Sequence, residues 1–407
     1  MKRSSILAIL STLFITASCV SSNSLFQKGE LSTPLTTQAN NEFDILVPTT
    51  QSSNLIFVGV EIGGRDYRFL FDTGAPMVIS KELQAEFQFR VRGEHQVNDS
   101  QNRSKMQNYV EIDSLYFGAL LFTDLVAIEA DLRYSPVLAC LNIDGIIGAN
   151  LMRHAFWEMD AATGYLRMTS TQKNWPLNNP KLISKPFKIQ STFTPVVELR
   201  VGNTLYRNIT FDTGSVDLLS LGKADNTNYN KDSVAFKASG ILGAGLFGSI
   251  IDTSESQFLD LYLDSVPYQC PIEFASVKNA RLLGMSFFKH FRIYMDWTAK
   301  TMHYLPHETL DFTHEKSYPT APFVEGDAII IGQINDLTER EKLNLALGDT
   351  IEMINGRSFY PAVADAYCEV IRLFKTEEQL LLQIRNKGAV LIRKQAIFSS
   401  ANLRKRL

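Results

Sequence analysis

The chain contains two copies of one sequence unit, and this internal repeat constrains the fold more than any other feature. In each copy an apolar run leads into the triplet Asp-Thr-Gly, at residues 72–74 and 212–214. A serine follows at the same spacing in both copies, at Ser80 and Ser220. Because each copy of a repeat is expected to form the same structural unit, the sequence predicts two similarly folded halves.

A second landmark lies downstream of each triplet and sets the extent of the repeat. Two apolar residues precede Gly148 in the first copy and Gly284 in the second, at closely similar distances from the aspartates. A histidine and then a Met-Asp pair follow both glycines in register. The two copies are therefore placed at 43–175 and 183–308, with a short connector that contains proline and asparagine.

The apolar residues within each copy alternate with other residues, as at Val58, Val60 and Ile62. This period of two is typical of strands with one buried face. Gly-Gly and Gly-Asn pairs follow such runs, as hairpin turns do. With 407 residues and 45% apolar content, the chain can form two or three domains with their own cores. The sequence therefore predicts a mainly β fold.

Two equivalent aspartates suggest a shared hydrolytic site. One Asp-Thr-Gly triplet alone is a weak signal, because an aspartate in a turn often caps nearby backbone N–H groups. Two copies change this interpretation, since each half would supply one carboxyl group, from Asp72 and Asp212. Two close carboxyl groups cannot both ionise cheaply and hold one proton between them. Such a pair presents a base and an acid together, as the attack of water on a peptide bond requires.

The triplets and their downstream glycines resemble the paired motifs of the pepsin and retropepsin families of aspartic peptidases. The resemblance implies two tandem β lobes that form a bilobal fold, in which Asp72 and Asp212 activate a water to hydrolyse peptide bonds. It also implies that the hydroxyls of Thr73 and Thr213 hydrogen-bond across the lobe interface and keep the carboxyl groups coplanar. No cofactor and no metal is expected for this chemistry.

Four glycines are expected to support the pair of aspartates. Gly74 and Gly214 let backbone amides approach the carboxylates without a Cβ in the way. The resemblance implies that Gly148 and Gly284 pack beneath the active-site loops. The first motif departs from the family pattern, because Pro76 removes a backbone donor just after the triplet. This departure puts the position of the first aspartate in question.

Two segments are candidates for a hairpin that covers the substrate. The first copy has a polar stretch at 90–107, and the second has a glycine-rich stretch at 239–248; the sequence does not decide between them. The glycine-rich stretch also has the G-x-G-x-x-G spacing of dinucleotide-binding loops, which would need a βαβ unit around it. A hairpin is favoured because polar sequence precedes this stretch and the repeat places it between the two motifs.

The C-terminal residues 318–407 follow a third pattern and are expected to form a separate small α+β domain. Residues 328–331 are predicted as a strand and 337–347 as a short amphipathic helix. The string at 348–356 resembles PDZ domains, which implies peptide recruitment by strand addition. The usual carboxylate-binding loop of such domains is not recognisable. A structural or dimerising role is therefore the alternative.

The N-terminus indicates export to a bacterial cell envelope. Residues 1–18 hold Lys2 and Arg3 before a short apolar run, which is typical of a secretory signal peptide too short to span a bilayer. The small residues before Cys19 resemble a lipoprotein processing site, which implies an acylated Cys19 and a periplasmic or membrane-anchored protein. Ordinary secretion is the alternative. Residues 19–42 are polar without a period and are expected to be a flexible tether.

Charge and the remaining cysteines exclude other classes. The net charge of −3, without a basic stripe, argues against a nucleic-acid partner. Three cysteines remain at wide, irregular spacing, Cys140, Cys270 and Cys368, and they are expected to be buried small apolar residues, neither a disulfide framework nor metal ligands. His154 and His290, the histidines after the downstream glycines, are expected to be structural.

Three functional hypotheses remain. The favoured one is an aspartic endopeptidase, active as a monomer, that cleaves peptides or proteins recruited by the C-terminal domain. The second is a catalytically inactive peptide-binding lipoprotein on the same scaffold, although a decaying site would be expected to lose one triplet. The third, a homodimer in which each lobe pairs with its twin, is less economical because one chain supplies both aspartates.

Overall fold

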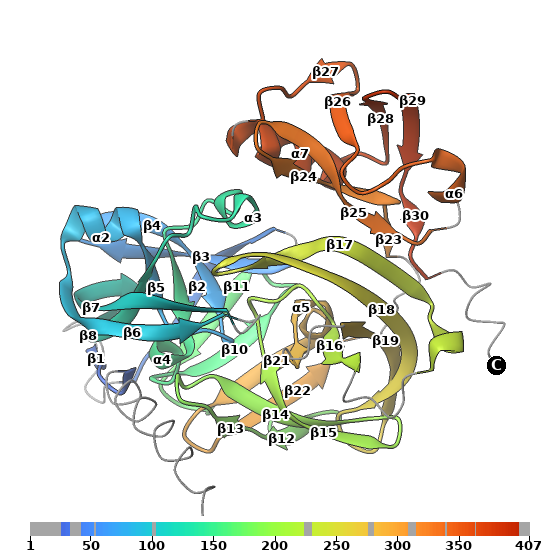
Figure 1. The fold of residues 1–407 in the computed structure, drawn as a ribbon. Helices are drawn as coiled ribbons and strands as arrows, with labels where there is room; N and C mark the ends of the chain where they lie inside the picture. The colour runs from blue at the N-terminus through green and yellow to red at the C-terminus, as the bar shows by residue number, and fades with distance from the viewer. Residues whose placement is uncertain are drawn as a thin grey trace, which may run out of the picture.

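The chain, described by a computed structural model, is mainly β with two large sheets, and this confirms the predicted fold class (Figure 1). The predicted signal peptide and Cys19 lie outside the residues that the structure describes. Within those residues, no helix is long and apolar enough to cross a membrane. The described residues are 26–32, 42–52, 54–99, 103–223, 230–275, 281–307, 315–337, 340–362 and 364–398.

One sheet forms most of the first half. Its strands are antiparallel neighbours, except that β4 runs parallel to β9 and β5 runs parallel to β8. The short helix α2 (Lys81–Phe87) follows β5 and begins where the Ser80 hydroxyl accepts a hydrogen bond from the Leu83 N–H at 3.1 Å. In order across the sheet, the strands are β3 (Leu55–Ile62), β4 (Arg65–Asp72), β9 (Gly145–Gly148), β5 (Val78–Ser80), β8 (Leu120–Ala130), β7 (Ser104–Phe117) and β6 (Arg90–Asn98).

The second half repeats this arrangement strand for strand. The parallel pairs recur as β15 with β20 and β16 with β19. The repeat in the sequence therefore corresponds to a repeat in the structure. In the equivalent order, the strands are β14 (Pro195–Val201), β15 (Thr204–Phe211), β20 (Leu282–Leu283), β16 (Leu219–Gly222), β19 (Pro267–Ala275), β18 (Gly248–Tyr262) and β17 (Phe236–Gly245).

A set of strands from both halves joins them. The central pair, β10 and β21, is antiparallel, and the Arg292 side chain donates to the Asp160 carboxylate at 2.9 Å across it. Most apolar side chains of both halves belong to one continuous core, which makes the halves a single packed body. The order is β12 (Ile183–Pro186), β22 (Thr301–Pro306), β21 (Phe291–Asp296), β10 (Phe156–Asp160), β11 (Tyr165–Thr169) and β2 (Asp44–Ser52).

Part of the segment predicted as a flexible tether is packed against the first half. Strand β1 (Glu30–Ser32) pairs with β8, and the buried Phe26 ring lies 5.0 Å from the Tyr109 ring. The Arg153 side chain also donates to the Gln27 carbonyl at 2.6 Å. The prediction missed this contact because a single aromatic anchor in a polar segment has no periodic signal.

The C-terminal unit is a small sheet with one longer helix. It stands apart from the two halves in Figure 1, and its buried apolar residues form a separate cluster. The predicted 337–347 helix is shorter in the structure, at α6. Its elements are β23 (Lys316–Ser317), β24 (Thr320–Glu325), β25 (Ala328–Asn335), α6 (Arg340–Leu343), β26 (Thr350–Ile354), β27 (Arg357–Ser358), α7 (Ala364–Thr376), β28 (Gln379–Ile384), β29 (Gly388–Arg393) and β30 (Gln395–Ala396).

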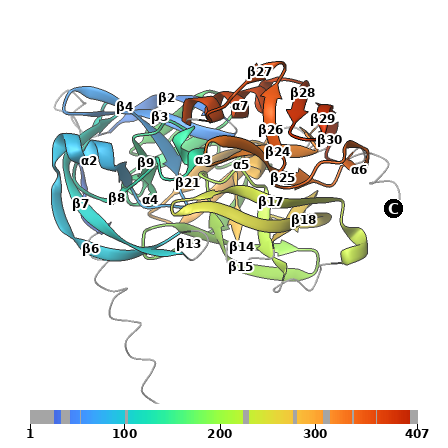
Figure 2. The ribbon, with the colours of Figure 1, turned by 45° about the horizontal axis from the view of Figure 1, so that its top comes forward.

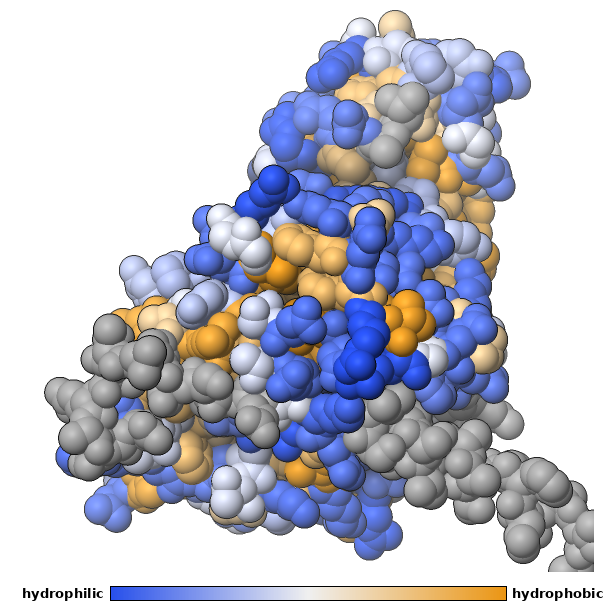
Figure 3. Space-filling view, turned by 90° about the vertical axis from the view of Figure 1, so that its left-hand side faces the viewer, coloured by the Kyte–Doolittle hydropathy of each residue, from blue (hydrophilic) through white to orange (hydrophobic). Residues whose placement is uncertain are grey.

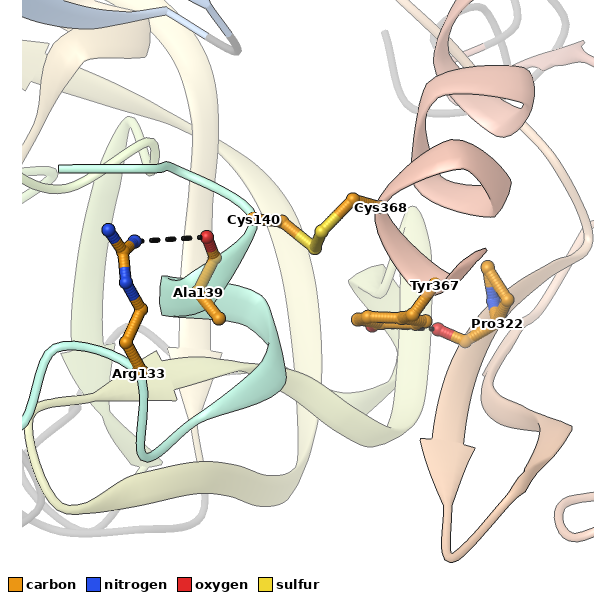
Figure 4. The surroundings of a disulfide bond; sticks show 6 residues. All are labelled: Arg133, Ala139, Cys140, Pro322, Tyr367 and Cys368. Atoms are coloured by element: carbon orange, nitrogen blue, oxygen red, sulfur yellow. Dashed lines mark hydrogen bonds between the residues drawn. A yellow bond between two sulfur atoms is a disulfide. The ribbon is translucent and has the colours of Figure 1, made fainter. Parts of the chain in front are cut away.

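A disulfide bond joins the C-terminal unit to the first half, and the prediction of three unpaired cysteines is wrong for two of them. Cys140, just after helix α3 (Pro136–Ala139), is bonded to Cys368 on α7 (Figure 4). The partners are 228 residues apart, so their pairing depends on how the units are arranged, which spacing alone does not reveal. Cys270 is free and buried, as predicted.

The C-terminal unit lies above both halves. With the top of the molecule turned forward, it lies beside β17, with which β25 pairs, and a disulfide joins it to the residue after α3 (Figure 2). From the side of the first half, it rises above a surface on which hydrophilic residues predominate and apolar residues form separate patches (Figure 3). The unit is therefore attached to the region where the two halves meet.

Candidate active site

The two repeated aspartates lie side by side at the junction of the halves. Asp72 ends β4 and is paired in register with Gly148 on β9. Asp212 directly follows β15, and its N–H donates to the Leu283 carbonyl of β20 at 2.9 Å. Each carboxyl group lies against the triplet of the other half, since the atoms nearest to a Cβ at Gly74 are those of the Asp212 carboxyl and the atoms nearest to one at Gly214 are those of the Asp72 carboxyl. The structure thus brings together the residues that the sequence placed at equivalent positions.

The glycine of each triplet donates a hydrogen bond to the aspartate of its own half. Because it has no Cβ, it also leaves space for the aspartate of the other half. The Gly74 N–H donates to Asp72 Oδ1 at 2.7 Å, and the Gly214 N–H donates to Asp212 Oδ1 at 2.9 Å. A Cβ at Gly74 would lie 2.5 Å from Asp212 Cγ, and one at Gly214 would lie 2.4 Å from Asp72 Cγ. Only glycine fits either position without displacing a carboxyl group.

The threonines of the triplets cross between the halves. The Thr73 hydroxyl donates to the Phe211 carbonyl at 2.6 Å and accepts from the Thr213 N–H at 3.0 Å. The Thr213 hydroxyl donates to the Phe71 carbonyl at 2.9 Å and accepts from the Thr73 N–H at 3.0 Å. Both threonines are buried. These four hydrogen bonds fix the relative position of the loops that carry the aspartates.

The loop that contains Pro76 keeps the first aspartate in place. Its neighbours supply the hydrogen bonds: the Ala149 N–H donates to the Ala75 carbonyl at 2.9 Å, and the Met77 N–H donates to Asn150 Oδ1 at 2.7 Å. A Cβ on Gly148 would lie only 2.1 Å from the Pro76 carbonyl carbon. The residues on both sides of Pro76 are thus hydrogen-bonded to Ala149 and Asn150, which holds the loop next to Asp72.

The second half uses the same support beneath its loop. The Met285 N–H donates to the Ser215 carbonyl at 2.9 Å, and a Cβ on Gly284 would lie 2.6 Å from the Asp217 carbonyl oxygen. Gly148 and Gly284 are also the N-terminal caps of two equivalent short helices, α4 (Ala149–Met152) and α5 (Met285–Phe288). The downstream glycines thus lie under the two site loops in both halves.

Burial and mutual charge shift the titration of the pair. Burial raises the pKa of the Asp72 carboxyl above its usual range, although hydrogen bonds to it oppose this shift. The pKa of the Asp212 carboxyl lies well above its usual range, because of burial and then the neighbouring Asp72 charge. Such coupled groups lose their protons one after the other and not together. The pair can therefore hold a single proton over a wide pH interval.

Two further acidic residues, which were not among the predicted site residues, lie on the second-half side of the pair. Asp217 adds to the negative charge that Asp212 experiences. Burial, and next the charge of Asp217, raises the pKa of the Glu273 carboxyl to about 8. The proximity of Asp217 to the triplet was a usable signal. No signal in the sequence indicated Glu273, because it is brought near Asp217 only by the pairing of β16 with β19.

The substitution Glu273→Gln is expected to stabilise the protein at neutral pH. The unfolded chain loses this proton near the ordinary value of 4.5, whereas the folded protein keeps it up to about pH 8, so rising pH favours unfolding in between. Glutamine removes this penalty, and the free energy of unfolding should rise by on the order of 3 kcal/mol at pH 7. Urea unfolding at pH 4 and pH 7 measures the change.

The control for this experiment is Glu61→Gln, on an exposed strand position of the first half. It should leave the free energy of unfolding unchanged within about 0.5 kcal/mol. At pH 4, Glu273→Gln and the parent should be equally stable. Equal stability of the two proteins at pH 7 would show that Glu273 carries no such penalty.

Two hairpins meet beside the site, and both stretches considered in the sequence analysis form one. The first-half hairpin is β6–β7 and the second-half hairpin is β17–β18. Arg103 of the first donates to the Gly248 carbonyl of the second at 2.8 Å, and the Phe247 N–H donates to Asp99 at 3.3 Å. Leu246, between β17 and β18, packs on the same apolar cluster as Ala75 of the site loop. The glycine-rich stretch is therefore a hairpin and not a nucleotide-binding loop.

The repeated histidines take no part in this arrangement. His154 packs near Phe122, with ring centroids 6.3 Å apart. Burial lowers the pKa of His154 and of His290 to about 4. Both are therefore neutral at neutral pH, in agreement with a structural role.

Comparison with known proteins finds a similarity in the first half. A family model described as aspartyl protease matches residues 58–151, a range that includes the first triplet and Gly148. No curated protein matches the chain. The match and the two-lobed β fold are those of an aspartic protease scaffold, and they indicate a hydrolase of the aspartic peptidase class.

Proposed function

We propose that the protein is an aspartic endopeptidase in which Asp72 and Asp212 form the catalytic pair. The observation that carries this proposal is the close approach of two partly buried carboxyl groups, each against the triplet glycine of the other half and each held by the amide of its own, Gly74 or Gly214. A pair that shares one proton supplies a general base and a general acid at one place. No covalent intermediate is needed.

The reaction follows from this single shared proton. The ionised carboxylate takes a proton from a water while the water oxygen attacks the peptide carbonyl carbon, and the protonated carboxyl donates to the carbonyl oxygen. The tetrahedral diol then collapses. One carboxyl protonates the leaving nitrogen as the C–N bond breaks, the other takes a proton from a diol hydroxyl, and the carbonyl forms again. The pair ends as it began, with one proton.

The pH dependence of cleavage tests this proposal. The value of kcat/KM is expected to be bell-shaped, because only the singly protonated pair is active. Since the pKa of the Asp212 carboxyl is raised well above the usual 3.8, the alkaline limb should lie well above pH 4. Hydrolysis of quenched fluorescent peptides between about pH 3 and 9 gives the profile. A rate that only increases up to pH 9 would argue against a shared proton.

The C-terminal unit is proposed to be a PDZ-like module that recruits peptides by strand addition. Strand β24 pairs with β25, and helix α7 packs beside β24. This position of a helix next to a strand of the sheet supports the proposal. The Tyr367 hydroxyl lies 3.4 Å from the Pro322 carbonyl in this region (Figure 4). A complex of the Asp72→Asn protein with an uncleaved peptide tests it: an added strand beside β24 supports recruitment, and its absence leaves a structural role.

The protein is further proposed to be a monomeric lipoprotein of the bacterial cell envelope, anchored through an acylated Cys19. The sequence before Cys19 supports the anchor, and the presence of both aspartates in one chain supports the monomer. Cys19→Ser should release the protein from membranes, and mass spectrometry of the N-terminal peptide should identify the acyl chains. Sedimentation of the active protein as a dimer would contradict the monomer.

A further inference from the structure

We propose that the C-terminal unit holds the second-half hairpin in place, so that the site opens by movement of the first-half hairpin. Opening of the site for substrate rests on the proposed function. The restraint of the second-half hairpin by the C-terminal unit does not depend on that function. The proposal assigns different roles to two hairpins that occupy equivalent places in the repeat.

The outer edges of the two hairpins differ. Among the described residues, β6 pairs only with β7. The outer edge of the first-half hairpin is therefore an unpaired strand edge. The equivalent strand of the second half, β17, pairs with β18 on one side and with β25 of the C-terminal unit on the other. The second-half hairpin is thus the inner part of a larger sheet that continues into the C-terminal unit.

The contact between β17 and β25 is close. Ala238, Ser239 and Gly240 are paired with residues of β25, and beyond them the Asp336 N–H donates to the Lys237 carbonyl at 2.8 Å. Gly240 has a φ of +114°, and a Cβ there would lie 2.3 Å from the Gly332 carbonyl oxygen. This backbone approach depends on glycine.

The C-terminal unit also packs against the base of the same hairpin. The Phe398 ring, which follows β30, lies 4.8 Å from the Phe258 ring of β18 and 6.3 Å from the Phe236 ring of β17. Phe398 is buried and belongs to the main core of the two halves. The hairpin is therefore held along its edge and at its base.

The unit is itself anchored to the opposite half. The Cys140–Cys368 disulfide connects α7 to the residue that follows α3 in the first half (Figure 4). A second contact lies nearby, where the Lys375 side chain donates to the Ser52 hydroxyl at 2.9 Å. Because one face of the unit is bonded to the first half and another to β17, the unit cannot swing away with the second-half hairpin.

The contacts between the two hairpin tips are those that opening would break. They include the hydrogen bonds from Arg103 to Gly248 and Ser249 and from the Phe247 N–H to Asp99, and the Lys105 ammonium that lies 5.3 Å from the Phe247 ring centroid. No strand pairing joins the tips in the described residues. Since the second-half hairpin is fixed on its far edge, separation of the tips requires the free-edged first-half hairpin to move.

Amide hydrogen exchange of the intact, oxidised protein tests this asymmetry directly. Peptides from the first-half hairpin, 90–107, should exchange about tenfold or more faster than peptides from the second-half hairpin, 238–250, because local opening is easier where an edge is unpaired. An equal or opposite order of exchange would overturn the proposal. The measurement does not depend on peptidase activity.

Variants then test which contact provides the restraint. Cys140→Ser and Cys368→Ser each remove the same disulfide, and Gly240→Ala disturbs the β17–β25 approach. Each should raise exchange of the second-half hairpin about tenfold or more. The matched control is Gly243→Ala in the same strand, where the nearest atom to a Cβ is Ile250 Cδ1 at 3.7 Å. Its exchange should equal that of the parent.

Circular dichroism and thermal unfolding establish that each variant is folded. If the folded cysteine variants and the folded Gly240→Ala protein all keep the exchange of the parent, the C-terminal unit does not restrain the hairpin. If only the cysteine variants fail to fold, Gly240→Ala still decides the question. A failed catalytic assignment would instead appear as unchanged cleavage by the Asp72→Asn protein, so the two failures are distinguishable.

Discussion

Replacement of either paired aspartate by asparagine is expected to reduce kcat/KM for peptide hydrolysis by about 10²–10⁴-fold. Asparagine has nearly the same shape, but it can neither take a proton from water nor share one with its partner. Because the two carboxyls act as one unit, Asp72→Asn, Asp212→Asn and the double variant should lose similar amounts of activity. Steady-state cleavage of a fluorescent peptide measures the loss.

The free energy of unfolding separates this chemical effect from misfolding. Since burial and mutual repulsion disfavour the ionised pair, each asparagine variant should be at least as stable as the parent at neutral pH. The control is Asp66→Asn, at an exposed position in the same strand, β4, which should retain full activity. Full activity in Asp72→Asn or Asp212→Asn would remove the basis of the proposed mechanism.

The second large effect is expected from Gly74→Ala and Gly214→Ala. In each, the new methyl group would lie 2.5 Å or 2.4 Å from the carboxyl carbon of the aspartate in the other half, which must then move. A displacement of about 1 Å at reacting groups can cost about 100-fold in rate. Overpacking should also lower the free energy of unfolding by about 1–3 kcal/mol. Cleavage rates and urea unfolding of both variants provide the two measurements.

Gly59→Ala is the matched control for these glycines. Gly59 lies on β3, and no atom lies within 4 Å of a Cβ built there. Its activity should equal that of the parent. If Gly74→Ala and Gly214→Ala also keep full activity, an added methyl group does not displace the carboxyl groups, and the expected overpacking is wrong.

Much of the fold and the core of the candidate site could be predicted from the sequence because both depend on local patterns that occur twice. Alternating apolar residues indicated strands such as β3 and β14. The triplets at 72–74 and 212–214 and the glycines downstream occupy equivalent places in both halves. A repeated local pattern is informative because each copy supports the interpretation of the other.

The features that could not be predicted depend on how separate units are arranged. The Cys140–Cys368 bond and the pairing of β17 with β25 join segments that no local pattern connects. Glu273 becomes a neighbour of the site only through the register of β16 and β19. The packed Phe26 is an isolated aromatic residue in a polar segment. Each of these is a long-range contact without a periodic signal.

The most direct test of the central claim is a crystal structure of the protein with a peptide that contains a statine group, whose hydroxyl replaces the attacking water. The proposed mechanism predicts that this hydroxyl oxygen lies within about 3.2 Å of a carboxyl oxygen of both Asp72 and Asp212. The peptide chain should lie beneath the two hairpin tips. A peptide that binds with its hydroxyl away from either aspartate, or that does not bind to the two halves at all, would contradict the account.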